Sequence, residues 1–267
     1  MEILLETNEY LVLNKPAGIS VHPSEKEALN RASGDRKVTV PTVSDWIQEK
    51  YPELKSIGEP MELSGVQVFR PGIVHRLDKD TTGCLLVAKT QEVFLHFKKQ
   101  FQEHTIQKTY HCFVYGAIKA DDGVIDEPIG RSRGDVRRWT TGGSARGTIR
   151  DALTEYTVLS RIGVEEGKGS TDVGTYSFVE CRPKTGRTHQ IRVHMKSINY
   201  PIVSDMLYAE KRIESENRLS KPNLGFERLA LHARNLAFSD MAGNRIEVEA
   251  PYPADFEFAL DTVAKKD

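Results

Sequence analysis

Runs of strand-forming residues separated by turns are the feature that most limits the folds open to this chain. Apolar and β-branched residues gather at residues 10–13, 110–114, 154–159, 176–181 and 229–238. Such runs predict strands, and the segments between them are turns rather than regular crossover helices. The pattern therefore favours a mixed α+β fold built on a largely antiparallel sheet.

Two helices and one long loop are predicted beside these strands. Residues 91–103 place apolar side chains on one stripe with polar residues opposite, as in a helix that packs on the core. That stripe consists of Val93, Phe94, Phe97 and Phe101. Residues 42–51 predict a short helix capped near Thr42 or Ser44. The polar stretch at residues 24–37 is expected to be a flexible loop.

The bulk composition is that of a water-soluble globular protein, with 267 residues, 39% hydrophobic and 28% charged. No repeat or Pro/Ser-rich linker divides the chain, so we expect a single domain over residues 1–267. Cys84, Cys112 and Cys181 stand alone in apolar runs, which favours buried free thiols. Such thiols fit a reducing cytoplasm, and neither a signal peptide nor an apolar run of membrane-spanning length is visible. The sequence does not determine the oligomeric state, and a monomer is the default expectation.

Charge is spread unevenly along a nearly neutral chain. The net charge of -1 by itself argues against a nucleic-acid partner. Residues 131–150, however, hold six arginines against the single acid Asp135, and residues 182–196 hold five Lys/Arg and no acid. We therefore expect a phosphate-rich ligand on one side of the molecule. The alternative is that the arginines of residues 131–150 only solvate a loop. The candidate phosphate contacts there are Arg137, Arg138 and Arg146.

One charged segment lies between two apolar runs. Ile73 and Val74 lead into it, and the apolar residues 84–88 follow it. Buried strands on both sides would hold the charged loop at a cleft, where reactive groups are commonly presented. The loop carries two carboxylates, Asp78 and Asp80. From the residues alone, an ordinary exposed turn is equally compatible with this pattern.

A basic segment in the second half of the chain predicts a short helix. Ile191, Met195 and Ile198 recur at helical spacing and would anchor a helix over residues 188–197. Arg192 lies on a different edge, from which its guanidinium could reach a carboxylate across a cleft and bind it through two hydrogen bonds. The alternative is that Arg192 only solvates the helix.

The start of this helix offers a seat for an anion but not for a metal. The Gly186-Arg187-Thr188 step would leave backbone N–H groups at the helix start, as in many phosphate sites. His189 and His194 are five residues apart, so their rings do not share a helix face as zinc ligands four apart do. No dinucleotide or phosphate-loop fingerprint occurs either. We therefore expect neither a metal nor a cofactor.

Four short motifs stand in a fixed order along about residues 10–240. Asn14-Lys15-Pro16-Ala17-Gly18 with Val21-His22-Pro23 comes first, and His75-Arg76-Leu77-Asp78 with Thr81-Thr82-Gly83 comes second. Lys108-Thr109-Tyr110-His111 is the third, and residues 182–194 form the fourth. Each resembles a motif of the pseudouridine synthases of the ribosomal large-subunit type, in that family's order. Thr82 stands where serine is commoner.

The resemblance implies a fold and a reaction. The family's fold is a long, bent mixed sheet with helices and loops around a central RNA-binding cleft. Its first motif begins here at about residue 14, so the N-terminal RNA-binding module of larger members is not expected. The family isomerises uridines of ribosomal or transfer RNA without a cofactor. The base is flipped out, its N1–C1′ bond is broken, and C5 is joined to C1′.

The resemblance also implies a catalytic set of Asp78, Tyr110 and Arg192. Asp78 matches the essential carboxylate, which is ionised whether it attacks C1′, adds to C6 or abstracts a ribose proton, and the sequence does not choose among these. Arg192 would be its counter-charge. Tyr110 would stack beneath the target uracil and assist proton removal at C5, and Ile191 would form the opposite apolar wall. Asp80 falls at a variable place of the motif and is interpreted as a turn residue.

The other matched residues are assigned to RNA binding. Arg76 matches the arginine that enters the RNA and holds the flipped nucleotide. His75 and Thr81 would shape the loop around it. The RNA-binding set is His75, Arg76, Thr81, Lys108, Arg187, His189 and Ile191, although Arg187 could instead solvate the helix.

Two functions of other classes remain open. A non-catalytic RNA-binding protein would keep the scaffold, but it would have no reason to retain Arg76, Asp78, Tyr110 and Arg192 together. A glycosidase would need a second catalytic carboxyl group, and no motif offers one.

Overall fold

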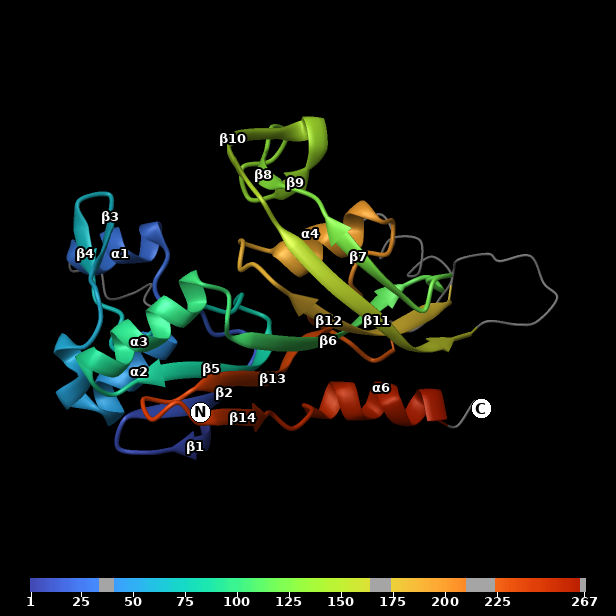
Figure 1. Cartoon of the computed structure of the whole chain (residues 1–267). Coiled ribbons are helices and arrows are strands. Elements are labelled where there is room, and N and C mark those ends of the chain that lie inside the picture. Colours follow the sequence, from blue (N-terminus) through green and yellow to red (C-terminus); the bar gives the residue numbers. More distant parts are fainter. Residues whose placement is uncertain (34–40, 164–173, 210–223, 265–267) are drawn as a thin grey trace. The chain divides into compact units, whose positions relative to one another are not determined.

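The computed structural model describes residues 1–33, 41–163, 174–209 and 224–264 (Figure 1). The chain divides into two compact units. Unit 1 comprises Met1–Ile106 and Asn235–Ala250, and unit 2 comprises Gln107–Arg234 and Pro251–Asp267. Two compact units can belong to one domain, so the single domain over residues 1–267 stays a prediction.

The strands of unit 1 pair in antiparallel fashion. β2 lies between β1 and β5, and β14 pairs with the part of β13 that belongs to this unit. The strands are β1 (Glu2–Glu6), β2 (Tyr10–Lys15), β5 (Thr82–Ala88), β13 (Leu231–Ser239) and β14 (Arg245–Glu249). Every residue of β5 is buried, which is typical of a strand covered on both faces. The first of these strands to be predicted, at residues 10–13, is confirmed as β2.

Helices and one small hairpin complete unit 1. They are α1 (Glu25–Ala32), α2 (Val43–Lys50), the 3₁₀ helix Pro52–Ser56, β3 (Met61–Leu63), β4 (Val66–Val68) and α3 (Gln91–Gln102). α2 begins after Thr42, whose side chain caps the helix as predicted. The stripe of α3 is also confirmed, because Phe97 packs edge-on against Tyr10 and Phe238 in the core of this unit.

The loop predicted at residues 24–37 is wrong over residues 25–32, which form α1. The hydroxyl of Ser24 accepts the backbone N–H of Glu27, and the Glu27 carboxylate accepts the backbone N–H of Ser24. This reciprocal capping box satisfies two donors at the helix start. Residues 34–37 lie outside the described part of the chain.

Unit 2 contains a second antiparallel array with the strand order β6–β12–β11–β7. These strands are β6 (Gln107–Tyr115), β7 (Asp122–Asp126), β11 (Leu153–Ile162) and β12 (Tyr176–Pro183). The helices of this unit are α4 (Gln190–Ser197) and α6 (Ala254–Ala264). Both contribute to its core, in which Met195 of α4 and Phe256 of α6 are fully buried.

A small three-stranded sheet lies beside the N-terminal end of β11, and the strand β10 of this sheet directly precedes β11 in the chain (Figure 1). Its strand order is β10–β8–β9. The strands are β8 (Ile129–Ser132), β9 (Trp139–Thr141) and β10 (Ala145–Arg150). Arg131, Arg146 and Arg150 lie on these strands, and the other three arginines of the basic stretch lie in the loop between β8 and β9.

The predicted α+β class is confirmed, because the strand pairs described within both units are antiparallel and helices accompany them. Cys84, Cys112 and Cys181 are buried free thiols, as expected. Within the described ranges, no helix has the length and apolar character needed to cross a membrane. The same ranges contain no group of three His, Cys, Asp or Glu side chains placed to hold a metal ion.

Candidate active site

The loop that carries Asp78 is anchored at both ends within unit 1. On its N-terminal side, Ile73 forms a β-bridge with Val87 of β5. On its C-terminal side, the backbone N–H of Thr81 donates to the carbonyl of Asp78 over 3.2 Å, and β5 follows at once. Asp78 itself is half-buried.

A tight turn immediately precedes this loop. The N–H of Ile73 donates to the carbonyl of Arg70 (3.1 Å), with Pro71 and Gly72 between them and Gly72 at φ +63°. A Cβ at residue 72 would lie 2.0 Å from the Ala88 carbonyl oxygen, so only glycine fits. Because of this turn, the strand predicted before the loop is reduced to the single bridge at Ile73, and that part of the prediction is wrong.

Lys15 of β2 is fully buried, and carbonyl oxygens surround its ammonium group. Its Nζ donates to the carbonyls of Pro16, Ile19 and Lys79, each over 2.8 Å. These three bonds match the three N–H donors of an ammonium group. Because Lys79 directly follows Asp78, the buried charge ties the first motif to the loop that carries the candidate catalytic carboxylate.

Two predicted RNA-binding residues lie inside the support of this loop. Nε2 of His75 accepts the backbone N–H of Leu86 (2.9 Å), and its ring stacks on Phe101 of α3 with 4.7 Å between centroids. Thr81 is buried, and its hydroxyl has no hydrogen-bond partner within the described residues. These positions support a loop-shaping role for both residues, and their contact with RNA stays a prediction.

Arg76 is exposed on the same loop and is positioned by a histidine of the first motif. Its Nη1 lies 3.3 Å from Nε2 of His22, whose Nδ1 lies 3.1 Å from the carbonyl of Pro23. Burial lowers the pKa of His22, and the positive charges of Arg76 and Arg70 lower it further. A neutral ring that donates from Nδ1 to Pro23 can accept from Arg76 at Nε2.

In unit 2, the structure brings Tyr110 and Ile191 into one apolar cluster. Tyr110 is on β6, opposite Cys181 of β12, and packs against the core cluster to which Ile191 of α4 belongs. Ile191 is 5% exposed. Both side chains are therefore held by the core, as residues that sandwich a flat base would need to be. Their contact with a base stays a prediction.

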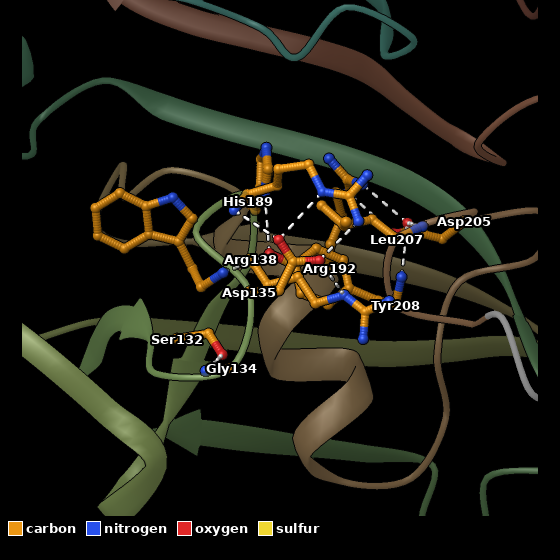
Figure 2. Close-up of polar contacts among 11 residues, drawn as sticks. Ser132, Gly134, Asp135, Arg138, His189, Arg192, Asp205, Leu207 and Tyr208 are labelled. Carbon is orange, nitrogen blue, oxygen red and sulfur yellow. Dashed lines mark hydrogen bonds and ion pairs between the residues drawn. The ribbon is translucent and has the colours of Figure 1, made fainter.

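Arg192 of α4 is bound along one edge by Asp205. Its Nε donates to Oδ2 over 2.7 Å and its Nη2 donates to Oδ1 over 2.8 Å (Figure 2). The Arg192 side chain is 11% exposed and that of Asp205 is 0%. Asp205 Oδ1 also accepts the backbone N–H groups of Leu207 (3.0 Å) and Tyr208 (3.2 Å). The carboxylate is thus fixed by the backbone and in turn fixes the plane of the guanidinium.

Asp205 was not predicted as a partner of Arg192. The predicted carboxylate partner of this arginine is Asp78, and that pairing stays a prediction. Asp205 follows the buried pair Ile202–Val203 and stands next to Ser204, whose φ is +56°. An acid directly after an apolar run is a weak signal, because it is also typical of an ordinary turn.

A tyrosine joins α4 to the small sheet. The hydroxyl of Tyr208 lies 2.9 Å from Nδ1 of His189 and accepts the backbone N–H of Trp139 over 2.9 Å. The guanidinium of Arg192 lies over the Tyr208 ring, 5.0 Å from its centroid. His189 precedes α4 in the left-handed conformation, with φ +56°. Its predicted RNA contact is untested, but its ring belongs to the group of residues around Arg192 (Figure 2).

Lys108 and Arg187 place two positive charges near each other at the start of α4. Lys108 Nζ donates to the carbonyl of Thr185 over 3.1 Å. Burial lowers the pKa of Lys108 to about 8, and the charge of Arg187 contributes to the shift. The predicted N–H seat is wrong in one respect, because the Arg187 N–H donates to the Gln190 side chain over 3.0 Å.

The arginines in and around the small sheet differ in whether an acidic side chain binds them. Asp135 binds Arg137 through two bonds of 3.1 and 2.8 Å, and Nε of Arg138 lies 3.5 Å from the same carboxylate. The side chain of Arg137 is the main cause that lowers the pKa of Asp135 to about 2. Two of the three predicted phosphate contacts are therefore already paired with an acid. Arg146 and Arg150 are exposed on β10.

The chain is similar in sequence to proteins of one enzyme family. The profile of the RNA pseudouridylate synthase family matches residues 9–197. An uncharacterized RNA pseudouridine synthase of Synechocystis is 36% identical over 97% of this chain and 68% of that protein. The ribosomal large subunit pseudouridine synthase D of Zymomonas mobilis is 34% identical over 96% of this chain and 71% of that protein. The enzyme of the same name from Pseudomonas aeruginosa is 35% identical, over 97% and 71%.

Two solved human structures share the fold. The one titled RNA pseudouridylate synthase domain containing 1 has a TM-score of 0.66 at 24% identity, and covers 94% of this chain and 83% of its own. The one titled RNA pseudouridylate synthase domain containing 4 has a TM-score of 0.67 at 22% identity, over 98% and 92%. At these identities the likeness concerns the fold alone.

Proposed function

The chain belongs to the RNA pseudouridylate synthase family, and from this premise we propose that it modifies uridines in the RNA of the large ribosomal subunit. It is an isomerase, because an RNA pseudouridine synthase rearranges a uridine without adding or removing atoms. The names of the Zymomonas and Pseudomonas relatives support ribosomal RNA as its substrate. Transfer RNA is the alternative substrate. We also infer that the protein works in the cytoplasm as a monomer.

In the proposed reaction, Asp78 provides the essential carboxylate. The N1–C1′ bond of a flipped-out uridine breaks, the uracil turns, and a C5–C1′ bond forms. The proton of C5 is lost and one proton is gained at N1, so the atoms balance. Asp78 is half-buried on a loop that Lys15 holds through a hydrogen bond to the carbonyl of Lys79. Such anchoring suits a group that must stay within reach of a sugar carbon while the base turns.

The observation that carries this assignment is the binding of Arg192 by Asp205. Asp205 accepts hydrogen bonds from Nε and Nη2 of the guanidinium. Because the guanidinium is planar, these two bonds fix the orientation of the whole group. We propose that Arg192, held in this way, is the counter-charge of Asp78. A nearly buried arginine that is held in one plane loses little conformational entropy when it binds a second carboxylate.

The flipped base would lie between Tyr110 and Ile191. Both side chains belong to one apolar cluster, and an aromatic face replaces the stacking that an extruded base loses, worth about 1 to 3 kcal/mol per base. Arg76 would hold the flipped nucleotide, while Lys108, Arg187 and His189 would contact the backbone of the RNA. His75 and Thr81 would act on the RNA through the shape of the loop.

Mapping pseudouridines in RNA from cells with and without this chain tests the proposed function. Ribosomal and transfer RNA are sequenced separately after chemical conversion of pseudouridine. We expect one or more pseudouridines of the large-subunit RNA to disappear without the chain and to return when it is supplied again. If only transfer RNA changes, the substrate is wrong. If neither RNA changes, the chain is a non-catalytic RNA-binding protein.

A further inference from the structure

Arg70 is an arginine of unit 1 whose charge no sequence motif explains. Its side chain is half-buried, and its Nε is buried without a hydrogen-bond partner. Within the described ranges, its guanidinium forms no hydrogen bond or ion pair. A buried donor that lacks an acceptor costs free energy, so an acceptor beyond the described residues would stabilise this position.

The backbone that presents Arg70 is rigid. Its carbonyl accepts the N–H of Ile73 across the Pro71–Gly72 turn. The same turn is bound on both sides, because the Gly72 N–H donates to the Ile57 carbonyl (3.0 Å) and the Gly72 carbonyl accepts the N–H of Ala88 (2.9 Å). Arg70 therefore has a fixed position just before the loop that bears Arg76 and Asp78.

Positive charge accumulates around this turn. Burial lowers the pKa of Arg70, the charge of Glu59 opposes this shift, and the charge of Arg76 adds a smaller lowering. Glu59 itself binds Lys98, with 2.5 Å between Oε1 and Nζ. His22 accepts a hydrogen bond from Arg76, and the charges of both arginines lower its pKa. The nearby acid is thus matched by Lys98, and two guanidinium groups remain beside a neutral imidazole.

We propose that Arg70 and Arg76 together bind one phosphodiester group of the RNA substrate, with His22 holding Arg76 in position. A phosphodiester supplies acceptor oxygens for the guanidinium of Arg70, which has none within the described residues, and its negative charge offsets the repulsion between the two arginines. A guanidinium binds phosphate oxygens through paired hydrogen bonds more readily than an ammonium group does. The inference rests on the proposed function, since it takes RNA as the ligand.

The test measures binding of a single-stranded, uridine-containing RNA at several salt concentrations. All variants are made in an Asp78→Asn background, so that turnover does not complicate binding. Arg70→Gln is expected to weaken the affinity about tenfold, as the loss of one charge-assisted hydrogen-bonded contact would. The log-log salt slope should become shallower by about 0.7. Its melting temperature should not fall, because the variant removes a half-buried charge whose desolvation is the main unfavourable effect at this position.

Arg245→Gln is the matched control, because Arg245 is an exposed arginine of unit 1 that already lies 3.7 Å from Glu247. It should leave the affinity and the slope unchanged. Arg70→Lys keeps the charge but not the fork, so it should restore the salt slope and only part of the affinity.

Equal affinities and slopes for Arg70→Gln and Arg245→Gln would overturn the inference. An Arg70→Lys variant with the same affinity and the same salt slope as Arg70→Gln would also overturn it. So would a loss of affinity in Arg70→Gln that is accompanied by a lowered melting temperature. These readouts need no catalysis. If the pseudouridine map fails while Arg70→Gln still weakens binding, the proposed function falls and the phosphate site stands.

Discussion

Arg192 and Asp205 form a buried, two-bonded ion pair in which the carboxylate is held by the backbone of the turn that follows it. The pair gives the guanidinium a fixed plane before any RNA is bound. Removing one partner of such a pair leaves a buried charge without compensation, which costs more than the pair contributes when intact. Asp205 is therefore expected to matter for both stability and catalysis.

Asp205→Asn should lower the free energy of unfolding by about 3 kcal/mol or more, because it removes the buried negative charge that binds Arg192 through two hydrogen bonds, at nearly constant shape. Turnover by the folded fraction should fall at least about tenfold, as a misaligned counter-charge loses transition-state stabilisation. Urea unfolding and single-turnover assays measure the two effects. Asp255→Asn is the matched control, since the Arg228–Asp255 pair of the same unit is more exposed, at 17% and 23%. A control loss as large as that of Asp205→Asn would contradict the argument.

Lys15→Met should destabilise unit 1 and loosen the loop that carries Asp78. The variant removes a buried ammonium and leaves three carbonyls without their donor, at a cost of about 2 kcal/mol or more. Lys89→Met removes a partly exposed lysine that binds Glu6, and should cost less than about 1 kcal/mol. Thermal unfolding and hydrogen exchange at residues 76–80 check this. Unchanged exchange in the Lys15 variant would show that the loop is held by other contacts.

The regular elements could be predicted because each follows from its own neighbours in the sequence. The stripe of α3 needs only a helical period, and the cap of α2 needs only Thr42 before an apolar residue. α1 was missed although Ser24 and Glu27 carry a capping-box spacing, because the polar composition of the segment outweighed that signal. Its boundaries depend on two side-chain bonds rather than on hydrophobic periodicity.

The site was predicted only where a motif marks it. Asp205 lies thirteen residues beyond Arg192 with no periodic relation to it, so the contact arises only once the chain has turned back on α4. Lys15 belongs to a quoted motif, but a lysine is expected at the surface, and its burial depends on carbonyls from residues as distant as Lys79. Contacts of this kind are set by tertiary structure and leave little trace in local sequence.

Lys108 should make RNA binding depend on pH near its pKa of about 8. It is charged below that pH and neutral above it, so affinity should fall as the pH rises from 7 to 9. Lys108→Met should flatten this part of the profile. If the Lys108 variant keeps the full pH dependence, another group is responsible.

The lowered pKa of Lys108 should make the stability of the protein rise with pH, although RNA affinity falls. The folded pKa lies below the unfolded value of about 10.4, so between about pH 8 and 10.4 the unfolded chain binds more protons than the folded one. The free energy of unfolding should therefore rise with pH across this window in the wild type, relative to Lys108→Met. Denaturant titrations of both proteins at pH 7.5, 9 and 10 measure the difference.

Salt titrations should distinguish the exposed arginines of β10 from the arginines that Asp135 binds. Changing Arg146 and Arg150 together to Gln should make the log-log salt slope of RNA binding shallower by up to about 0.7 per lost contact. Changing Arg137 and Arg138 should have a smaller effect, because Asp135 already binds them. Asp135→Asn should strengthen binding. Equal slopes in all variants would show that this sheet only solvates its arginines.

The most direct test of the central claim is Asp78→Asn, which removes one charge at almost constant shape. The variant is assayed for tritium release from 5-³H-uridine RNA, and its RNA affinity and melting temperature are measured beside those of the wild type. Asp80→Asn is the matched control, because it makes the same change two residues away on the same loop. We expect Asp78→Asn to fold, bind RNA and release no tritium, while Asp80→Asn stays active. Measurable turnover by Asp78→Asn would contradict the assignment of Asp78 as the catalytic carboxylate.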